Sequence, residues 1–538
     1  MTDAALHLPH LATVPSRAGA ASIGEHVHLG SLRTPHRAAI ATPEGAVRTY
    51  RDLDERTNRI AQSLLSYGLR PGDRLAIWMH NCLEYLDVYL ACVKAGIVVV
   101  QVNIRHTVFE ATFQIEDSGA SALVFDEAVA HQVESLDVAS ELRLLVHSGT
   151  QPSRQSVPLE DLVEEGANVM PPAPGDDDLM VIGYTSGTTG FPKGAMLTHR
   201  SVRTLGQTNA ITNRYAMAST QVFALSLSFT AGIPAHILTH LYVGGTTVLL
   251  RDWDTDLLVD QIERHRATFT IVPSPPIPQF CDLVEADPKR VSSLVGVLHS
   301  ASKAPPEHLE RMVDVIGTRL IEGWGMTENS GGLIAATTAD DYLQRRPEIF
   351  TSTGRPAPDA VIRLVDELGD PLPHDGESVG QLVAHSASLA AGYWNNPQAT
   401  AETFRDGWYF SGDLGRIDPE GYVYILDRRP DLIITGGMNV YPSELERVIM
   451  TLDGVLEVAV VAAPHERWGQ TPVAYVVSRD PTVDETAVLA ACQEQLASYK
   501  RPSRVYVMSD LPKNASGKVL RNKLREQAAD AVDIPDGS

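Results

Sequence analysis

The sequence predicts an α/β protein: a large amino-terminal domain of parallel-rich sheets flanked by helices, with a small β-barrel-like part, and then a smaller α+β domain. Three observations support this prediction. The chain has 538 residues, which is more than one hydrophobic core usually serves. Amphipathic stretches alternate with short apolar runs through the first part of the chain. After about residue 345 the segments become shorter and richer in turn residues.

The first part of the chain alternates helices with buried strands. Residues 52–68 have the apolar spacing of an amphipathic helix, 71–81 predict a turn and a strand, and 84–96 predict a second helix. The apolar run 97–103 then predicts a buried strand. The same succession recurs at 121–126, 142–148, 246–251, 262–273 and 294–300. Because strands joined through helices usually run parallel, we expect parallel sheets covered by helices.

The last part of the chain predicts a different architecture. Residues 363–386 and 421–431 have the turn-rich pattern of β-hairpins or of a small barrel. A small α/β domain is expected to follow. Its elements would be a helix at 443–454, strands at 455–464 and 472–479, a helix at 485–499 and a strand at 504–510.

The composition disfavours several classes of protein. A formal net charge of −23 is unfavourable for nucleic-acid binding, which requires a surplus of Lys and Arg. The four cysteines lie far apart without metal-ligand spacing: Cys82, Cys92, Cys281 and Cys492. We therefore expect a reducing, cytoplasmic location without a disulfide framework or a zinc site.

Neither a secretory signal nor an integral membrane segment is expected. The first residues lack a basic start followed by an unbroken apolar run. The apolar stretch at 222–250 contains His236, His240 and several Gly, Ser and Thr residues, which disfavour membrane insertion. This stretch is expected to form a buried helix, turn and strand.

Residues 181–199 predict a phosphate-binding loop between an apolar strand and a helix. Glycines allow a tight turn with exposed amides, hydroxyls add donors, and a lysine supplies positive charge. These residues are Thr185, Ser186, Gly187, Thr188, Thr189, Gly190 and Lys193. Pro192 and Gly194 break the GxxxxGK[ST] pattern, so a P-loop NTPase is disfavoured. An ordinary flexible surface loop is the alternative.

The phosphate-binding loop is followed by further motifs: GWGMTEN at 323–329, STGRP at 352–356, GYWNNPQAT at 392–400, a long segment at 407–446 and PKNASGKVLRNKLRE at 512–526. In this order the motifs resemble those of the adenylate-forming superfamily of AMP-dependent synthetases and ligases, acyl-CoA synthetase type. The resemblance spans nearly the whole chain. It implies that ATP, Mg²⁺ and coenzyme A (CoA) take part in the reaction.

The resemblance implies roles for residues around the nucleotide. Trp324 would stack on adenine, Thr327 would contact the α-phosphate, and Glu328 would hold Mg²⁺. Asp413 and Arg428 match the positions that bind the ribose hydroxyls. Further residues expected at the ATP or AMP site are Ala304, Pro305, Gly323, Gly325, Met326 and Ile425.

Lys518, in NASGKVLR, matches the mobile catalytic lysine of the family. Together with Lys193, Thr327 and Glu328 it is predicted to be catalytic, because its ammonium would meet charge that develops at the α-phosphoryl group. Without the resemblance, Lys518 would be a solvated surface lysine. Trp324 would then be a core aromatic, and Asp413 a turn residue.

The resemblance also implies a domain rotation between the two half-reactions. Residues 1–427 would form the ATP- and acyl-binding domain, 428–431 the hinge, and 432–538 the mobile domain. Pro430 replaces the usual Asp or Lys of the hinge. Since proline fixes its own φ and restricts the residue before it, neighbouring torsions are expected to supply the rotation. Gly436 and Gly437, which follow the hinge, match the glycines of the family's loop beside the tunnel for the CoA thiol.

The acyl pocket is expected at Phe229, Thr230, Gly232, Ile233, Ser302, Lys303 and Gly323. Phe229 stands where the family often has histidine. Thr230, where amino-acid-activating relatives have Asp, argues against an α-amino acid, and Gly323 argues against a short dicarboxylate. An aryl or medium- to long-chain acyl acid is therefore implied. Lys303 would either bind a polar group of the substrate or be a solvated edge residue.

The resemblance thus implies an ATP-dependent acid:CoA ligase that forms an acyl-AMP and then an acyl-CoA thioester, as in fatty acid metabolism. The main alternative is a stand-alone adenylating enzyme that loads the acid onto a carrier protein. A luciferase-like oxidation of the acyl-AMP and a noncatalytic nucleotide-binding relative are further alternatives. A homodimer is compatible with the sequence.

Overall fold

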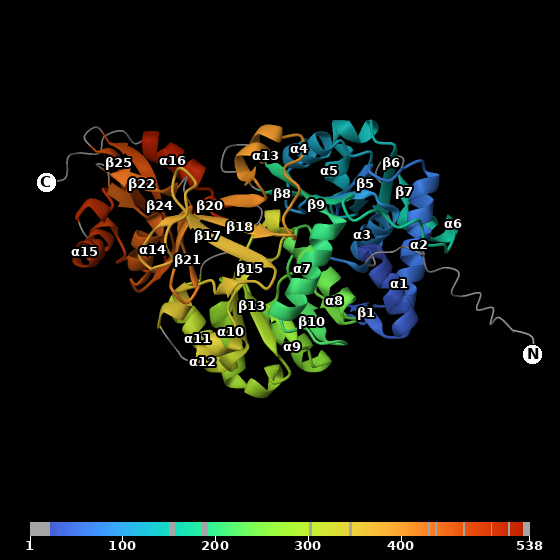
Figure 1. Ribbon diagram of the computed structural model, residues 1–538, viewed down its shortest axis with the longest axis horizontal. Helices are drawn as coiled ribbons and strands as arrows, with labels where there is room; N and C mark the ends of the chain where they lie inside the picture. The colour runs from blue at the N-terminus through green and yellow to red at the C-terminus, as the bar shows by residue number, and fades with distance from the viewer. Residues whose placement is uncertain are drawn as a thin grey trace, which may run out of the picture.

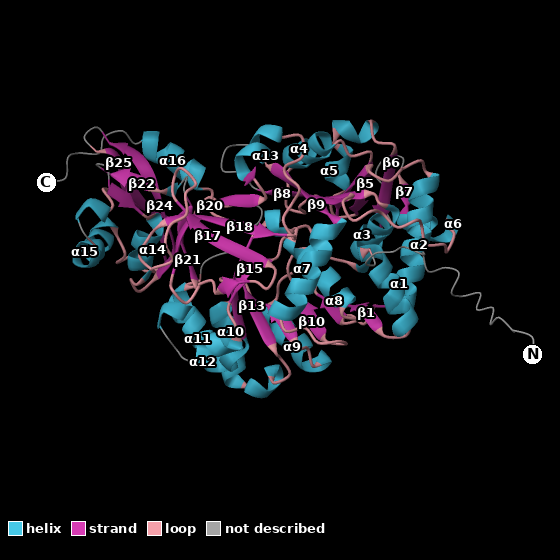
Figure 2. Cartoon of the chain, viewed as in Figure 1, coloured by secondary structure: helices cyan, strands magenta, loops and turns pink. Residues whose placement is uncertain are grey.

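A computed structural model describes residues 22–149, 156–185, 192–300, 304–343, 347–428, 431–435, 438–465, 468–496, 498–514 and 517–530. Within these ranges the chain forms four sheets. Two are large and mostly parallel, one is antiparallel, and one belongs to the carboxyl-terminal part (Figure 1). Helices cover the large sheets (Figure 2).

The seven-stranded sheet contains the phosphate-loop strands at one edge. Its order is β7 (Val157–Pro158), β6 (Leu144–Ser148), β5 (Ala122–Asp126), β3 (Arg74–Trp78), β4 (Val98–Gln101), β8 (Leu179–Thr185) and β9 (Lys193–Thr198). All these pairs are parallel except β8 with β9. All four residues of β4 are buried, as expected for an apolar strand covered on both faces.

Helices pack on both faces of this sheet. One face contacts the apolar sides of α2 (Tyr50–Ser66) and α3 (Leu83–Ala95). The other face contacts α4 (Val108–Ser118) and α5 (Ala130–Glu134). The hydroxyl of Thr49 accepts from the backbone N–H of Asp52, so a capping box fixes the start of α2. The helices α1 (Ile23–Arg33) and α6 (Leu159–Glu165) pack against α2.

The nine-stranded sheet contains the other half of the site. Its order is β16 (Arg355–Pro356), β15 (Leu333–Ala336), β14 (Leu320–Gly325), β13 (Gly296–His299), β12 (Phe269–Ile271), β10 (Thr220–Phe223), β11 (Thr246–Leu249), β1 (Ala38–Ala41) and β2 (Val47–Thr49). The strands from β14 through β1 pair in parallel. The pairs at both ends of the sheet are antiparallel.

Helices also cover the nine-stranded sheet. The apolar sides of α9 (Thr255–His265), α10 (Ile277–Ala286) and α11 (Pro306–Ile316) form one cluster with it. On the other face lie α7 (His199–Thr212), the π-helical segment η3 (Ala231–Ile237) and α8 (Leu238–Tyr242). The short helix α12 (Ala339–Leu343) follows β15.

The antiparallel sheet consists of β17 (Ala360–Val365), β18 (Gly380–Ser386), β20 (Trp408–Ile417), β19 (Phe404–Arg405) and β21 (Val423–Arg428). All its pairs are antiparallel. The helix α13 (Pro397–Thr403) connects β18 with β19. The β-hairpins predicted after residue 345 are therefore present.

The carboxyl-terminal part lies at one end of the molecule, away from α1 and α2 (Figure 1). Its sheet contains β23 (Met438–Val440), β22 (Ile433–Thr435), β25 (Gly469–Ser478), β24 (Val455–His465) and β26 (Arg504–Met508). The helices are α14 (Pro442–Met450), α15 (Glu485–Gln495) and α16 (Arg521–Asp530). Two apolar clusters, one on each face of the sheet, belong to this part alone.

The predicted fold class is confirmed, with one informative difference. The predicted phosphate loop is followed by a strand, β9, before the expected helix α7, and β9 is antiparallel to β8, as β15 is to β14. Each pair is joined by a short connection rather than by a crossover helix, and such connections require antiparallel strands. The two loops that were predicted to bind nucleotide are therefore hairpin loops.

Two negative predictions can also be compared with the structure. The stretch at 222–250 forms the end of β10, then η3, α8 and β11, so it is buried as expected. Among the described residues no helix has both the length and the apolar character needed to cross a membrane. All four cysteines are free thiols.

Candidate active site

The two hairpin loops meet the predicted acyl segment at two glycines. Gly183 lies in β8, where an added Cβ would be 2.5 Å from the Thr230 hydroxyl and 3.0 Å from the Thr327 methyl. Gly331 has a φ of +81°, and its Cβ would lie 2.7 Å from the Cα of Ala231. Thr327 and Thr230 were predicted beside the phosphate and the acid. The structure brings them to the same glycine.

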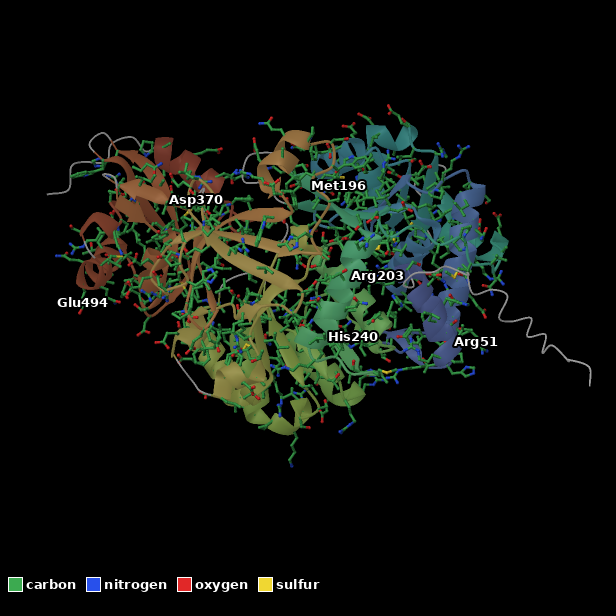
Figure 3. All side chains as sticks on the ribbon, in the orientation of Figure 1. Arg51, Met196, Arg203, His240, Asp370 and Glu494 are labelled. Carbon is green, nitrogen blue, oxygen red and sulfur yellow. The ribbon has the colours of Figure 1, made fainter. Side chains whose placement is uncertain are left out.

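A segment that we call the strap, residues 386–396, runs along the strand that follows the phosphate loop. The Met196 N–H donates to Gly392 O at 2.9 Å, and the Ala391 N–H donates to Met196 O at 2.9 Å. Met196, labelled in Figure 3, lies in β9. The Trp394 N–H donates to Gly194 O at 2.8 Å. Residues 391–394 of the strap are thus hydrogen-bonded to β9.

The other edge of the strap holds the GWGMTEN loop. The Ala390 N–H donates to Glu328 O at 2.7 Å. The Ser388 hydroxyl donates to Asn329 Oδ1 at 2.7 Å, and the Ser330 hydroxyl donates to Ser388 O at 2.9 Å. Loops from two different sheets are therefore fixed relative to one another by a single stretch of chain.

At the centre of the strap, Tyr393 contacts two predicted catalytic residues. Its hydroxyl donates to Glu328 Oε1 at 2.6 Å. Its ring lies beneath the Lys193 ammonium, with 5.4 Å from Nζ to the ring centroid. Glu328 is only 8% exposed and Tyr393 only 6%. Sequence reasoning missed Tyr393, although it lies in the GYWNNPQAT motif.

Lys193 also faces an open polar cavity of about 350 Å³. The lining residues come from α4, the start of β9 and the strap: Phe113, Asp117, Pro192, Lys193, Gly194, Trp394, Asn395 and Asn396. The indole N–H of Trp394 donates to Asp117 O at 3.0 Å, and the Tyr184 hydroxyl donates to Asp117 Oδ2 at 2.6 Å. Lys193 therefore contacts the Tyr393 ring and also lines an open cavity.

Glu328 is compatible with a magnesium ion that receives most of its ligands from phosphate. Among the described residues no group of three or more His, Cys, Asp or Glu side chains could hold a metal. Mg²⁺ in phosphoryl-transfer sites typically takes one or two carboxylates plus substrate oxygens and water. One carboxylate oxygen of Glu328 is occupied by Tyr393, and a buried carboxylate is a suitable donor for such an ion.

Trp324 lies beside the antiparallel sheet and contacts the predicted ribose-binding residue. It is 6% exposed and packs in an apolar cluster with Ile334, Ile362 and Leu382, so most of its ring is already covered. Its indole N–H donates to Asp413 Oδ2 at 3.0 Å. The ring therefore orients the predicted ribose-binding carboxylate. Stacking of Trp324 on adenine stays a prediction.

The other residues predicted near the nucleotide lie on several elements. Met326 and Ile425 pack against the cluster that contains Trp324. Asp413 is paired directly with Arg428 across β20 and β21, although the Arg428 side chain lies outside the described part of the structure. Gly325 lies close to Gly332 O, where a Cβ would be 2.6 Å away. Ala304 and Pro305 immediately precede α11.

A buried hydrogen-bonded chain, which the sequence did not reveal, lies just before Trp324. His299 Nε2 is 2.8 Å from the Ser274 hydroxyl, and His299 Nδ1 is 2.5 Å from Glu322 Oε2. Burial raises the pKa of Glu322, and His299 opposes this shift. The three residues connect the segment after β12, the end of β13 and the middle of β14.

The acyl segment forms a tight turn before η3. Gly232 donates to Phe229 O at 2.8 Å, and a Cβ at Gly232 would be 3.0 Å from Ser226 O. Thr230 and Ile233 are buried beside this turn. The space beside Gly323, which was predicted to admit the acyl group, is filled: a Cβ there would lie 2.7 Å from Leu333 Cδ2. Gly323 thus permits the close approach of β15.

Lys518 lies in a tight turn of the carboxyl-terminal part. Lys513 and Val519 form an antiparallel bridge, and Asn514 Oδ1 accepts from the Lys518 N–H at 2.9 Å. Gly517 has a φ of +81°, a conformation that glycine adopts without strain. The Lys518 side chain is exposed.

An ion cluster connects this turn to the hinge region. In α16, the Arg521 guanidinium pairs with Glu446 at 2.6 Å, and Arg525 pairs with Asp431 at 2.7 Å. Asp431 belongs to the predicted hinge. The helix that starts three residues after Lys518 is therefore tied to the chain that leaves the hinge.

Several predicted residues lie outside the described residues, so their roles stay predictions. In the phosphate loop they are Ser186, Gly187, Thr188, Thr189 and Gly190, whereas Thr185 ends β8 and its hydroxyl donates to Lys193 O at 3.3 Å. The others are Ser302 and Lys303 of the acyl pocket, Pro430 of the hinge, and Gly436 and Gly437 of the thiol tunnel.

These loops and their buried carboxylate define an enzyme that handles a nucleotide, and comparison with known proteins identifies its kind. The chain belongs to the AMP-binding enzyme family. That family's profile matches residues 30–394, and the profile of the AMP-binding enzyme C-terminal domain matches residues 444–518.

Similar proteins of known function extend over nearly the whole chain. A feruloyl-CoA synthase of Amycolatopsis is 34% identical over 92% of this chain and 96% of its own length. A long-chain-fatty-acid–CoA ligase of Mycobacterium tuberculosis is 31% identical over 95% of this chain and 99% of its own. ATP-bound MatB from Rhodopseudomonas palustris superimposes with a TM-score of 0.86 at 30% identity, covering 95% and 100% of the two chains.

Proposed function

We propose that this protein is an ATP-dependent acid:CoA ligase, which converts a carboxylic acid to its acyl-AMP and then to an acyl-CoA thioester. The observation that carries the proposal is the Lys193–Tyr393–Glu328 arrangement, which joins the two nucleotide loops at one buried point. Family membership and the names of the similar proteins, which are CoA synthases and ligases, support the same activity.

In the first half-reaction, a carboxylate oxygen of the acid forms a bond to the α-phosphorus of ATP while the bond to pyrophosphate breaks. Negative charge accumulates on the transferred phosphoryl group and on the leaving pyrophosphate. Lys193, at the start of β9, would neutralise charge on the phosphates. Thr327 would donate its hydroxyl to an α-phosphate oxygen. Catalysis by positioned charges of this kind requires no nucleophilic side chain.

Glu328 would hold Mg²⁺, which when bound would neutralise phosphate charge and orient the departing pyrophosphate. The Asp413 carboxylate, oriented by Trp324, would accept hydrogen bonds from the ribose hydroxyls. Asp413 is 5% exposed, so these bonds would form in a largely dry environment, in which hydrogen bonds to charged groups are strong.

Lys518 would complete the adenylation site from the carboxyl-terminal domain. Its side chain is exposed, so a movement of that domain about residues 428–431 would be needed to bring it to the α-phosphate. In the second half-reaction the sulfur of CoA attacks the acyl carbon, the carbon–oxygen bond to AMP breaks, and the thiol proton leaves to solvent. We place the boundary between the domains at 427 and 432.

The acid that we propose is an aryl or medium- to long-chain acyl acid without an α-ammonium group. Phe229, Thr230 and Ile233 supply an apolar or neutral wall, and burial lowers the pKa of the neighbouring His236 to about 3, so it is uncharged at neutral pH. A charged substituent at this wall would lack a partner among these side chains. The cytoplasmic location and the homodimer stay predictions.

The proposal is tested by incubating the purified protein with ATP, Mg²⁺, CoA and a panel of carboxylic acids. Release of AMP and pyrophosphate that depends on an aryl or long-chain acid, together with a thioester product, is expected. A holo carrier protein is compared directly with CoA as the acceptor. If a thioester forms only on the carrier protein, the protein is a carrier-loading enzyme and not a CoA ligase. If pyrophosphate exchange does not depend on an acid, both proposals are refuted.

A further inference from the structure

We infer that Tyr393 is a positioning residue of the adenylation site: its hydroxyl holds the Glu328 carboxylate and its ring holds the Lys193 ammonium, so that a metal–nucleotide complex meets a preformed pair of charges. This inference rests on the proposed function, because it assigns a task within the same site. It concerns a residue that does not itself contact the reacting atoms.

The hydroxyl contact has the features of a strong hydrogen bond. The distance from the Tyr393 oxygen to Glu328 Oε1 is 2.6 Å, which is typical of an O–H donor facing an ionised oxygen. Both side chains are more than nine-tenths buried, so water competes little for either group. A hydrogen bond to a charged group is stronger than one between neutral groups, so it favours one rotamer of the carboxylate.

The ring contact fixes the second charge. The Lys193 ammonium lies 5.4 Å from the centroid of the Tyr393 ring, within the range of a cation–π interaction. One aromatic side chain thus contacts both charged groups, Lys193 through its ring and Glu328 through its hydroxyl. Neither contact is a direct ion pair between the two charges, so we infer that both remain available to a ligand.

The position of Tyr393 itself is determined by several contacts. Its backbone forms a β-bridge with Ala195 and its N–H donates to the Thr400 hydroxyl at 2.9 Å. Its ring packs edge-on against Phe404 at 5.7 Å between centroids. The tyrosine is therefore anchored to β9, α13 and β19, whereas Glu328 lies in a single 3-10 turn, Thr327–Asn329. We infer that the anchored tyrosine positions the carboxylate.

A purely packing role for Tyr393 makes a different prediction. Tyr393→Phe keeps the ring, its packing on Phe404 and its contact with Lys193, and it removes only the hydroxyl. If packing were the whole role, this variant would bind metal and nucleotide like the unmodified protein. If the hydroxyl positions Glu328, the variant loses metal affinity while its folding is retained.

The experiment titrates Mn²⁺, observed by electron paramagnetic resonance, into the full chain saturated with a non-hydrolysable ATP analogue. Tyr393→Phe should raise the dissociation constant of Mn²⁺ about tenfold. Tyr422→Phe is the matched control, because the Tyr422 hydroxyl donates to Asp341 Oδ1 at the same 2.6 Å away from the two nucleotide loops. That control should bind Mn²⁺ with unchanged affinity. An unchanged constant in Tyr393→Phe overturns the inference.

A double-variant cycle keeps the inference testable if Tyr393→Phe also perturbs folding. In the background of Glu328→Gln, removal of the Tyr393 hydroxyl should cause no further loss of Mn²⁺ binding, because the group that it positions is gone. Independent, additive losses would mean that Tyr393 acts elsewhere, and would overturn the inference. Mn²⁺ binding is measured without an acid, so its outcome is separate from the acid-dependent pyrophosphate exchange that tests the proposed function.

Discussion

The two predicted catalytic lysines are held in opposite ways. Lys193 begins a strand of the seven-stranded sheet, lies over the ring of Tyr393 and faces a strap that is hydrogen-bonded on both edges. Lys518 lies in an exposed turn of the carboxyl-terminal part, held by Asn514 and by the bridge between Lys513 and Val519. The Lys193 ammonium is held within the amino-terminal domain, and the Lys518 ammonium is exposed on the smaller carboxyl-terminal part.

This difference suggests different roles for the two lysines: Lys193 binds the phosphates of ATP throughout the cycle, and Lys518 acts in only one half-reaction. A charge that must bind ATP in every cycle benefits from preorganisation, because no reorganisation is then required during the reaction. A charge that is needed in only one half-reaction benefits from a position that it can leave. The predictions below test whether the two lysines differ in this way.

The largest expected effect is that of Lys518→Ala. We expect adenylation to slow about 10²–10³-fold, because a charge at the developing phosphoryl anion is lost. Thiolation of preformed acyl-AMP should proceed at nearly the rate of the unmodified protein. Single-turnover measurements of the two half-reactions check this. Equal loss in both would remove the proposed distinction between the lysines.

The amino-terminal scaffold should lose stability in mild acid through two buried histidines. Burial lowers the pKa of His236 and of His240 to about 3; His240 is labelled in Figure 3. The unfolded chain takes up these protons below about pH 6.5, whereas the folded protein does not until about pH 3. Stability is therefore complete above pH 6.5 and falls on acidification, by about 2 kcal/mol per histidine at pH 5.

Denaturant unfolding at pH 7.5 and pH 5 measures this loss. His240→Gln should reduce the difference in the free energy of unfolding between pH 7.5 and pH 5 by about 2 kcal/mol. The carboxyl-terminal part contains neither histidine, so the pH dependence of its unfolding should be unchanged. An unaltered pH dependence in the variant would mean that His240 is hydrated or charged in the folded protein.

The smallest expected effect concerns the ion cluster behind Lys518. Arg521→Met leaves the half-buried Glu446 without its 2.6 Å partner, and burial already raises the pKa of that carboxyl. We expect the carboxyl-terminal part to lose about 1–2 kcal/mol of stability.

The same variant should slow both half-reactions by a few fold, since the turn and the hinge exit are then less firmly connected. This outcome contrasts with the asymmetric effect of Lys518→Ala. An effect of Arg521→Met on adenylation alone, at unchanged stability, would show that the arginine contacts the substrate instead.

Local patterns were sufficient to predict many of the elements. The apolar spacing of 52–68 and 84–96 predicted α2 and α3, because periodicity depends on neighbours in the chain. The roles of Glu328, Asp413 and Lys518 came instead from the resemblance of their motifs to a known family.

The missed features depend on contacts between residues far apart in sequence. Tyr393 meets Glu328 across 65 positions, and Ser274, His299 and Glu322 come from three separate segments of the chain. The hydrogen bond from the Trp324 N–H to Asp413 likewise joins residues of two different sheets. No local pattern specifies such pairings, because sheet order and register bring them about.

The most direct test of the central claim is ATP–pyrophosphate exchange measured with and without an aryl or long-chain acid, for the unmodified protein, Lys193→Met and Glu328→Gln. The account predicts exchange that requires the acid and falls at least about tenfold in each variant, as expected when a charged partner of the phosphates is removed. Exchange that is independent of the acid, or that survives both substitutions at full rate, would contradict it.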